Sequence, residues 1–111
     1  MGTKKNKFEK MERLPIITPG QILLEEFMQP NGISQNALSI ATGMPTSRVN
    51  KIIKGDRSIT VETALRLSAF FNNNSEFWLN LQRDYDLECV ERDGTAMQIK
   101  ESVRTLKAAY N

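Results

Sequence analysis

The fold of this chain is determined by residues 34–55, which read SQNALSIATGMPTSRVNKIIKG. Ser34 is a typical helix N-cap residue, and the apolar side chains that follow it keep the spacing of one helix face. Gly43 can adopt a left-handed backbone conformation that other residues adopt only at a cost, so the helix can end there in a tight turn. The spacing therefore predicts two short helices joined by a turn.

The second helix of this stretch is amphipathic. Its apolar residues Val49, Ile52 and Ile53 fall at i, i+3 and i+4 and so define one buried stripe. Because successive helical residues are rotated by about 100°, the polar and basic side chains lie on the opposite face. Leu38 and Val49 have the offset at which two such helices pack together across a turn. This is the pattern of a helix-turn-helix whose second helix enters a groove of DNA.

The polar face of the second helix supplies the candidate DNA contacts. Residues near the start of such a helix usually meet base edges, where Arg or Lys can pair with guanine and Asn with adenine. We therefore predict base contacts from Thr46, Ser47, Arg48, Asn50 and Lys51. Contacts to phosphates are predicted from Gln35, Lys54 and Arg57. A basic helix face alone is most often solvated surface, so the helix-turn-helix spacing is what favours DNA here.

Helical spacing and caps extend through most of the remaining chain. A helix is predicted from Pro19, with Thr18 as N-cap and Gln21 closing a capping box, and it ends before Pro30. Further helices are predicted after the N-caps Thr60 and Ser75. We divide the all-α chain into a basic N-terminal arm (1–13), a helix-turn-helix core (14–75) and a C-terminal extension (76–111), which is helical or partly extended.

The helix predicted from Ser75 onward is apolar on two sides. Its apolar side chains spread around too much of the helix for a single buried face in a small domain. A second surface is needed to cover them, and this predicts a partner subunit. The residues expected at this dimer interface are Phe77, Trp78, Leu81 and Tyr85. A place in the core is the alternative for Trp78.

Composition excludes several other classes of protein. The chain has no histidine and only one cysteine, which excludes Cys/His zinc sites and catalysis by an imidazole base. We therefore expect neither a metal, nor a cofactor, nor an enzyme. No apolar run approaches the ~20 residues of a membrane span, and the N-terminus lacks the apolar core of a signal peptide. A cytoplasmic location is expected. The lysines of residues 1–13 either follow DNA phosphates or are simply solvated.

From residue 17 to residue 88 the sequence resembles the HigA/VapI-type antitoxins of bacterial toxin–antitoxin modules, a branch of the lambda-repressor-like (XRE) helix-turn-helix proteins. The resemblance is carried by PGQILLEEF (19–27), GMPTSRVNKIIKG (43–55), ITVETALRLSAFF (59–71) and, above all, SEFWLNLQRDYDLE (75–88). The last stretch is specific to this branch.

The resemblance implies a lambda-repressor-like domain of five helices with a C-terminal dimerisation extension. It also implies a homodimer that binds a palindromic operator in its own promoter and neutralises a HigB-type ribonuclease toxin. Carried onto this chain, the DNA-reading helix of the family falls on residues 46–54, and the dimer-forming region begins with residues 77–87. Two other functions stay open: an XRE-family regulator with no toxin partner, and a toxin-binding module that does not bind DNA.

Overall fold

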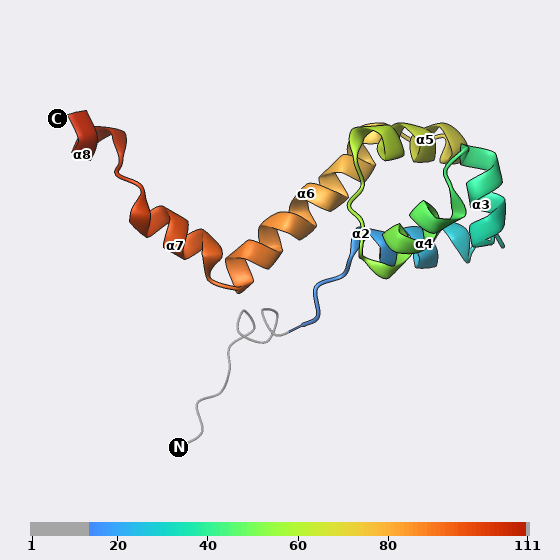
Figure 1. Cartoon of the computed structure of the whole chain (residues 1–111), viewed down its shortest axis with the longest axis horizontal. Helices are drawn as coiled ribbons and strands as arrows, with labels where there is room; N and C mark the ends of the chain where they lie inside the picture. Colours follow the sequence, from blue (N-terminus) through green and yellow to red (C-terminus); the bar gives the residue numbers. More distant parts are fainter. Residues whose placement is uncertain (1–13, 111) are drawn as a thin grey trace, which may run out of the picture. The chain divides into compact units, whose positions relative to one another are not determined.

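The computed structural model describes residues 14–110, so the predicted N-terminal arm lies outside the described residues. Every regular element within them is a helix, as the sequence predicts (Figure 1). Residues 17–85 form one compact unit, and the described residues on either side of it, 14–16 and 86–110, belong to another.

The first helix of the larger unit has two different geometries. It starts as α2 (Pro19–Ile22), where the Thr18 hydroxyl accepts a hydrogen bond from the Gln21 N–H at 3.1 Å. The Gln21 side chain donates to the Glu25 carboxylate, 3.3 Å away, rather than closing the predicted capping box. The chain then continues as the π-helix η1 (Leu23–Met28), where the sequence predicts an α-helix. The wider turn of a π-helix brings residues five apart to one side, and both Leu23 and Met28 are buried.

The predicted helix-turn-helix is formed by α3 (Gln35–Thr42) and α4 (Thr46–Lys54). The Ser34 hydroxyl caps α3 by accepting a hydrogen bond from the Ala37 N–H at 3.0 Å. Gly43 ends the helix in the left-handed region, at φ 73°. These features confirm the cap and the turn expected from the sequence.

Two longer helices follow. α5 (Val61–Phe71) starts at Thr60, whose hydroxyl accepts from the Thr63 N–H, and ends at Asn72 in the left-handed region. α6 (Ser75–Arg92) is one continuous helix. Its residue Gln82 is buried and accepts a hydrogen bond from the Ile59 N–H at 2.8 Å, which ties α6 to the segment before α5.

The core of the larger unit lies between these helices, and Figure 1 shows α3, α4 and α5 arranged around it. The helix-turn-helix contributes its predicted apolar stripe to this core. The buried apolar residues of the whole core are Leu23, Met28, Leu38, Met44, Val49, Ile52, Ile59, Ala64, Leu67 and Trp78. The ring of Phe27, a partly buried residue of η1, packs against that of Trp78 of α6, with centroids 4.7 Å apart and an angle of 53° between the ring planes.

Trp78 belongs to this core and not to a subunit interface. Its side chain is 0% exposed, and its indole N–H donates to the Asn73 side-chain oxygen at 2.9 Å. A side chain without exposed area has none to offer a partner, so the predicted interface role of Trp78 is corrected. The core also extends past residue 75, because α6 supplies Trp78 and Gln82 to it.

The smaller unit contains α7 (Thr95–Ser102) and α8 (Leu106–Tyr110). The two helices are separated by a break at which Val103 is extended, so of the two conformations that the sequence leaves open the segment is mainly helical. None of the described residues of this unit is buried. Its exposed large apolar side chains are Leu14, Leu87, Met97, Ile99, Val103, Leu106 and Tyr110.

Candidate nucleic-acid interface

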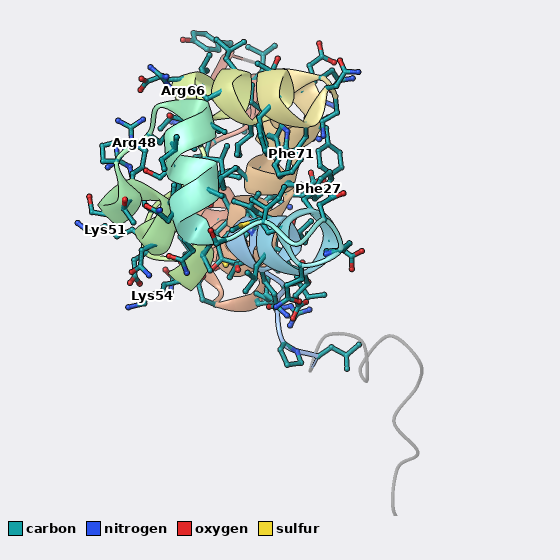
Figure 2. All side chains as sticks on the ribbon, turned by 90° about the vertical axis from the view of Figure 1, so that its right-hand side faces the viewer. Phe27, Arg48, Lys51, Lys54, Arg66 and Phe71 are labelled. Carbon is teal, nitrogen blue, oxygen red and sulfur yellow. The ribbon has the colours of Figure 1, made fainter. Side chains whose placement is uncertain are left out.

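α4 turns its apolar side chains into the core and its polar side chains outward. Val49 and Ile52 are buried, whereas Lys51 and Lys54 are exposed. In Figure 2 the labelled Arg48, Lys51 and Lys54 lie along one edge of the molecule, away from the core rings of Phe27 and Phe71. The predicted polar face is therefore accessible at Lys51 and Lys54, whereas Arg48 is half-buried.

The predicted contact residues differ in how exposed they are. Thr46, Ser47 and Lys51 are exposed at the start and middle of α4, where they can reach a groove of DNA. Three other predicted contacts in the two helices are half-buried: Gln35, Arg48 and Asn50. Lys54, at the end of α4, and Arg57, in the following loop, are exposed.

Gln35 and Asn50 join the two helices of the motif. The Asn50 side-chain amide donates to the side-chain oxygen of Gln35 at 3.1 Å. Each amide group carries two hydrogens, so Asn50 keeps one donor and its own oxygen, and Gln35 keeps its whole NH₂ group. The pair therefore links the first turn of α3 to α4 and leaves polar groups of both side chains available for other hydrogen bonds.

Ser39 holds the turn of the motif together, a role that the sequence does not reveal. Ser39 is buried, and its hydroxyl donates to the carbonyl of Met44 at 2.5 Å. The Thr46 hydroxyl in turn donates to Ser39 at 3.3 Å. The sequence presents Ser39 only as a small residue where two helices cross. In the structure it fixes the segment that leads into α4.

Arg48 is a predicted base contact that forms an ion pair within the chain. Its guanidinium lies 3.3 Å from the Glu62 carboxylate of α5, and its side chain is 19% exposed. Glu62 also pairs with Arg66, one turn further along α5. The sequence gives no signal for this contact, because 14 residues separate Arg48 from Glu62.

Comparison with known proteins gives the same motif. A helix-turn-helix family model matches residues 24–79. Virulence-associated protein I of Dichelobacter nodosus is 43% identical over 78% of this chain and 80% of its own length.

Two solved structures of similar proteins cover most of this chain. An addiction module antidote protein of the HigA family from Coxiella burnetii has a TM-score of 0.74 and 41% identity. The match covers 83% of this chain and 99% of that one. The antitoxin HigA of Pseudomonas aeruginosa, solved with the higBA promoter, has a TM-score of 0.75 and 34% identity over the same shares. The chain belongs to the HigA-type helix-turn-helix family.

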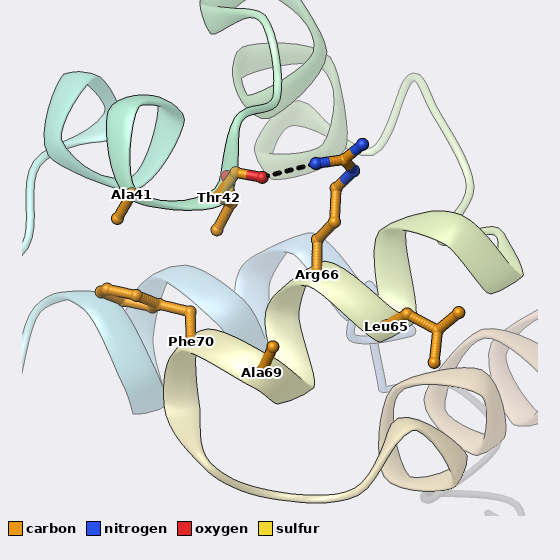
Figure 3. Close-up of a pocket in the computed structure, with 6 residues that line it drawn as sticks. All are labelled: Ala41, Thr42, Leu65, Arg66, Ala69 and Phe70. Atoms are coloured by element: carbon orange, nitrogen blue, oxygen red, sulfur yellow. Dashed lines mark hydrogen bonds between the residues drawn. The ribbon is translucent and has the colours of Figure 1, made fainter.

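This HigA-type chain also has a groove between α3 and α5, shown in Figure 3. The groove has a volume of about 530 Å³ and is lined by Ala41, Thr42, Leu65, Arg66, Ala69 and Phe70. Its lining combines polar and apolar groups, and Arg66 is its one charged side chain, so it lacks an acid and a base that could act together. In the part of the chain that the structure describes, no cluster of His, Cys, Asp or Glu could hold a metal.

Cys89 is a half-buried free thiol on α6. None of the described helices is both long enough and apolar enough to span a membrane.

Proposed function

We propose that this HigA-type chain is an antitoxin that binds DNA and represses its own operon. As a homodimer it binds a palindromic operator, and it neutralises a HigB-type ribonuclease toxin. The observation that carries the DNA-binding part is the accessible polar face of α4, with Thr46, Ser47 and Lys51 exposed next to the Gln35–Asn50 pair. The structure of Pseudomonas aeruginosa HigA with the higBA promoter, at 34% identity, supports it.

The geometry favours two roles for the polar residues of the motif. Thr46 and Ser47 at the start of α4, and Lys51 further along it, are exposed and read bases, together with the free edge of Asn50. Lys54 and Arg57 lie further along the chain and bind phosphates, as does Gln35 at the start of α3. Arg48 can contact a base only if it leaves Glu62.

The division of roles can be tested with two matched lysine variants. Lys51→Ala should weaken binding to a duplex containing the inverted repeat of the promoter by about ten- to a hundredfold, because a base contact contributes ~1–3 kcal/mol. Binding to a random duplex should change little. Lys54→Ala should weaken binding to both duplexes by a similar factor. It should also lower the slope of log K against log salt concentration by about one. Fluorescence anisotropy at several salt concentrations measures all of these.

Each variant is the control for the other, since both remove an exposed lysine from the same helix. Equal losses on both duplexes for Lys51→Ala would contradict its role as a base reader. If the unchanged protein bound the promoter no better than random DNA, the repressor part of the proposal would fail.

The toxin part needs a separate experiment. Co-expression with the product of the neighbouring gene, followed by copurification and an assay of RNA cleavage, should give a complex in which the ribonuclease is inactive. An operator-binding protein that captures no toxin would be a regulator without a toxin partner. A protein that captures the toxin but shows no preference for the operator would be a toxin-binding module alone.

A further inference from the structure

Arg48 lies in the recognition helix but does not face outward like its neighbours. Its side chain is 19% exposed, and its Nη1 atom lies 3.3 Å from Oε2 of Glu62. Its Nε atom is buried and has no hydrogen-bond partner. Lys51, one turn further along α4, is exposed. The guanidinium of Arg48 therefore lies between α4 and α5, and it is not displayed to a DNA groove.

Glu62 is the centre of a network that joins three elements. One carboxylate oxygen, Oε2, accepts from Arg48 of α4. The other, Oε1, accepts from both Nε and Nη2 of Arg66, at 3.3 and 3.2 Å. Both oxygens of Glu62 are therefore used, and each of them by an arginine. Glu62 also lies in the first turn of α5, where the helix dipole favours a negative charge.

Arg66 extends the network to the turn of the helix-turn-helix. Its Nη1 atom donates to the backbone carbonyl of Thr42 at 2.8 Å, as drawn in Figure 3. The same atom would lie 3.1 Å from a Cβ added at Gly43. The network thus connects the end of α3, the first turn of α5 and the first turn of α4. These are the parts that set where α4 begins and how it is rotated.

We infer that Glu62 is a positioning residue for DNA recognition in this chain. It holds Arg48 against α5 and so fixes the first turn of α4, from which Thr46 and Ser47 face outward. Arg48 then neither reads a base nor neutralises a phosphate. The inference rests on the proposed binding of DNA by α4. It goes beyond that proposal because Glu62 lies on another helix, carries the same charge as DNA, and belongs to no predicted contact set.

The charge of Glu62 makes the inference testable. If Glu62 acted only through electrostatics, Glu62→Gln would remove a negative charge near the DNA and strengthen binding to every duplex. If it positions α4, Glu62→Gln should weaken binding to the operator roughly five- to tenfold, because base contacts depend on geometry. Binding to a random duplex should not weaken. Glu26→Gln, which removes an exposed carboxylate from η1, is the matched control and should change the preference for the operator little.

A second variant and a double variant separate positioning from direct contact. Arg48→Met keeps the apolar stem of the side chain and removes its charge. We expect it to weaken operator binding by a factor similar to that of Glu62→Gln, and the double variant to be no worse than either. The salt slope should stay unchanged, because no phosphate contact is lost. In the free protein, hydrogen exchange at the Arg48 and Val49 amides should become faster in both single variants.

Several outcomes would overturn the inference. Stronger operator binding by Glu62→Gln would show that the carboxylate only repels DNA. A salt slope lowered by about one in Arg48→Met would show that Arg48 binds a phosphate. Additive losses in the double variant, or unchanged exchange at the start of α4, would also contradict positioning. A wild-type protein without operator preference would instead overturn the proposed function, and the inference with it. The Glu62 side chain is 57% exposed, and exposed ion pairs contribute little to stability, so Glu62→Gln should unfold at nearly the wild-type temperature. Thermal unfolding of the Arg48→Met and double variants checks that they keep the fold.

Discussion

Gly20 lies where α2 packs against the backbone of α4. A Cβ added at Gly20 would lie 1.8 Å from the carbonyl oxygen of Ile52 and 2.9 Å from Cα of Ile53. Backbone atoms cannot move aside as a flexible side chain can. We therefore expect Gly20→Ala to lower the free energy of unfolding by about 3 kcal/mol or more, because the added methyl group overpacks the core. Urea denaturation followed by circular dichroism measures this loss.

Gly32→Ala is the matched control for Gly20→Ala. Gly32 has φ +65°, but a Cβ there would have no atom within 4 Å. Its substitution should cost only the strain of a left-handed residue, about 1–2 kcal/mol. Equal losses in the two variants would contradict the close approach of α2 to α4. In the interior of an ordinary exposed helix, the change from Gly to Ala would instead stabilise the protein by up to about 1 kcal/mol.

At the scale of elements, α6 has to cover the core and still leave apolar side chains outside it. Trp78 is buried, and Leu79 and Leu81 pack against the core, whereas Leu87 is 52% exposed on the same helix. If residues of α6 form the proposed dimer interface, Leu87→Asp should shift the protein from dimer to monomer at micromolar concentration. The reason is that a charge in an apolar interface is costly to desolvate. Sedimentation velocity measures the change.

Leu65→Asp provides the comparison for Leu87→Asp. Leu65 is the same residue type with a similar exposed fraction, 55%, but it lies on α5. We expect this variant to remain dimeric. If Leu65→Asp dissociated the dimer and Leu87→Asp did not, the interface would lie over the groove between α3 and α5 and not on α6.

Local patterns predicted the elements of this chain better than they predicted their contacts. The caps at Thr18, Ser34 and Thr60 and the turn at Gly43 depend on residues within one helical turn, and all are confirmed. The predicted stripe of α4 is buried at Val49 and Ile52 and half-buried at Ile53. The sequence does not predict the π-helix, because the apolar residues of this segment also fit the spacing of an α-helix. The two geometries differ in the position of residues five apart, such as the buried Leu23 and Met28.

The missed contacts depend on residues distant in the sequence. Arg48 can pair with Glu62 only because the loop after α4 places the start of α5 next to the start of α4. Helical periodicity does not predict the path of that loop. The same limit explains why the sequence places Trp78 at an interface although it lies in the core. An apolar helix with two faces indicates that something covers each face, but not whether the cover is the chain's own core or a partner.

The described residues of the smaller unit form no buried core that could keep its helices folded in a monomer. None of its described residues is buried. α7 has 8 residues and α8 has 5, and isolated helices shorter than about 12–15 residues are marginal in water. Exposed apolar side chains on such helices are best explained by a surface that covers them. This supports the proposed assignment of the C-terminal extension to a dimer.

A dimer imposes a spacing on its operator, and the spacing can be changed. Two copies of α4 related by a twofold axis should reach half-sites about one turn of DNA apart, ~34–36 Å between centres. Inserting five base pairs between the half-sites turns one of them to the opposite face of the duplex. We expect such an insertion to lower the affinity by about a hundredfold or more, toward that of random DNA. Replacing the five central base pairs without changing the length should have a much smaller effect, since the spacing is kept. Affinity that survives the insertion would mean that single chains bind the half-sites independently, and the homodimer would no longer be needed to explain recognition of a palindrome.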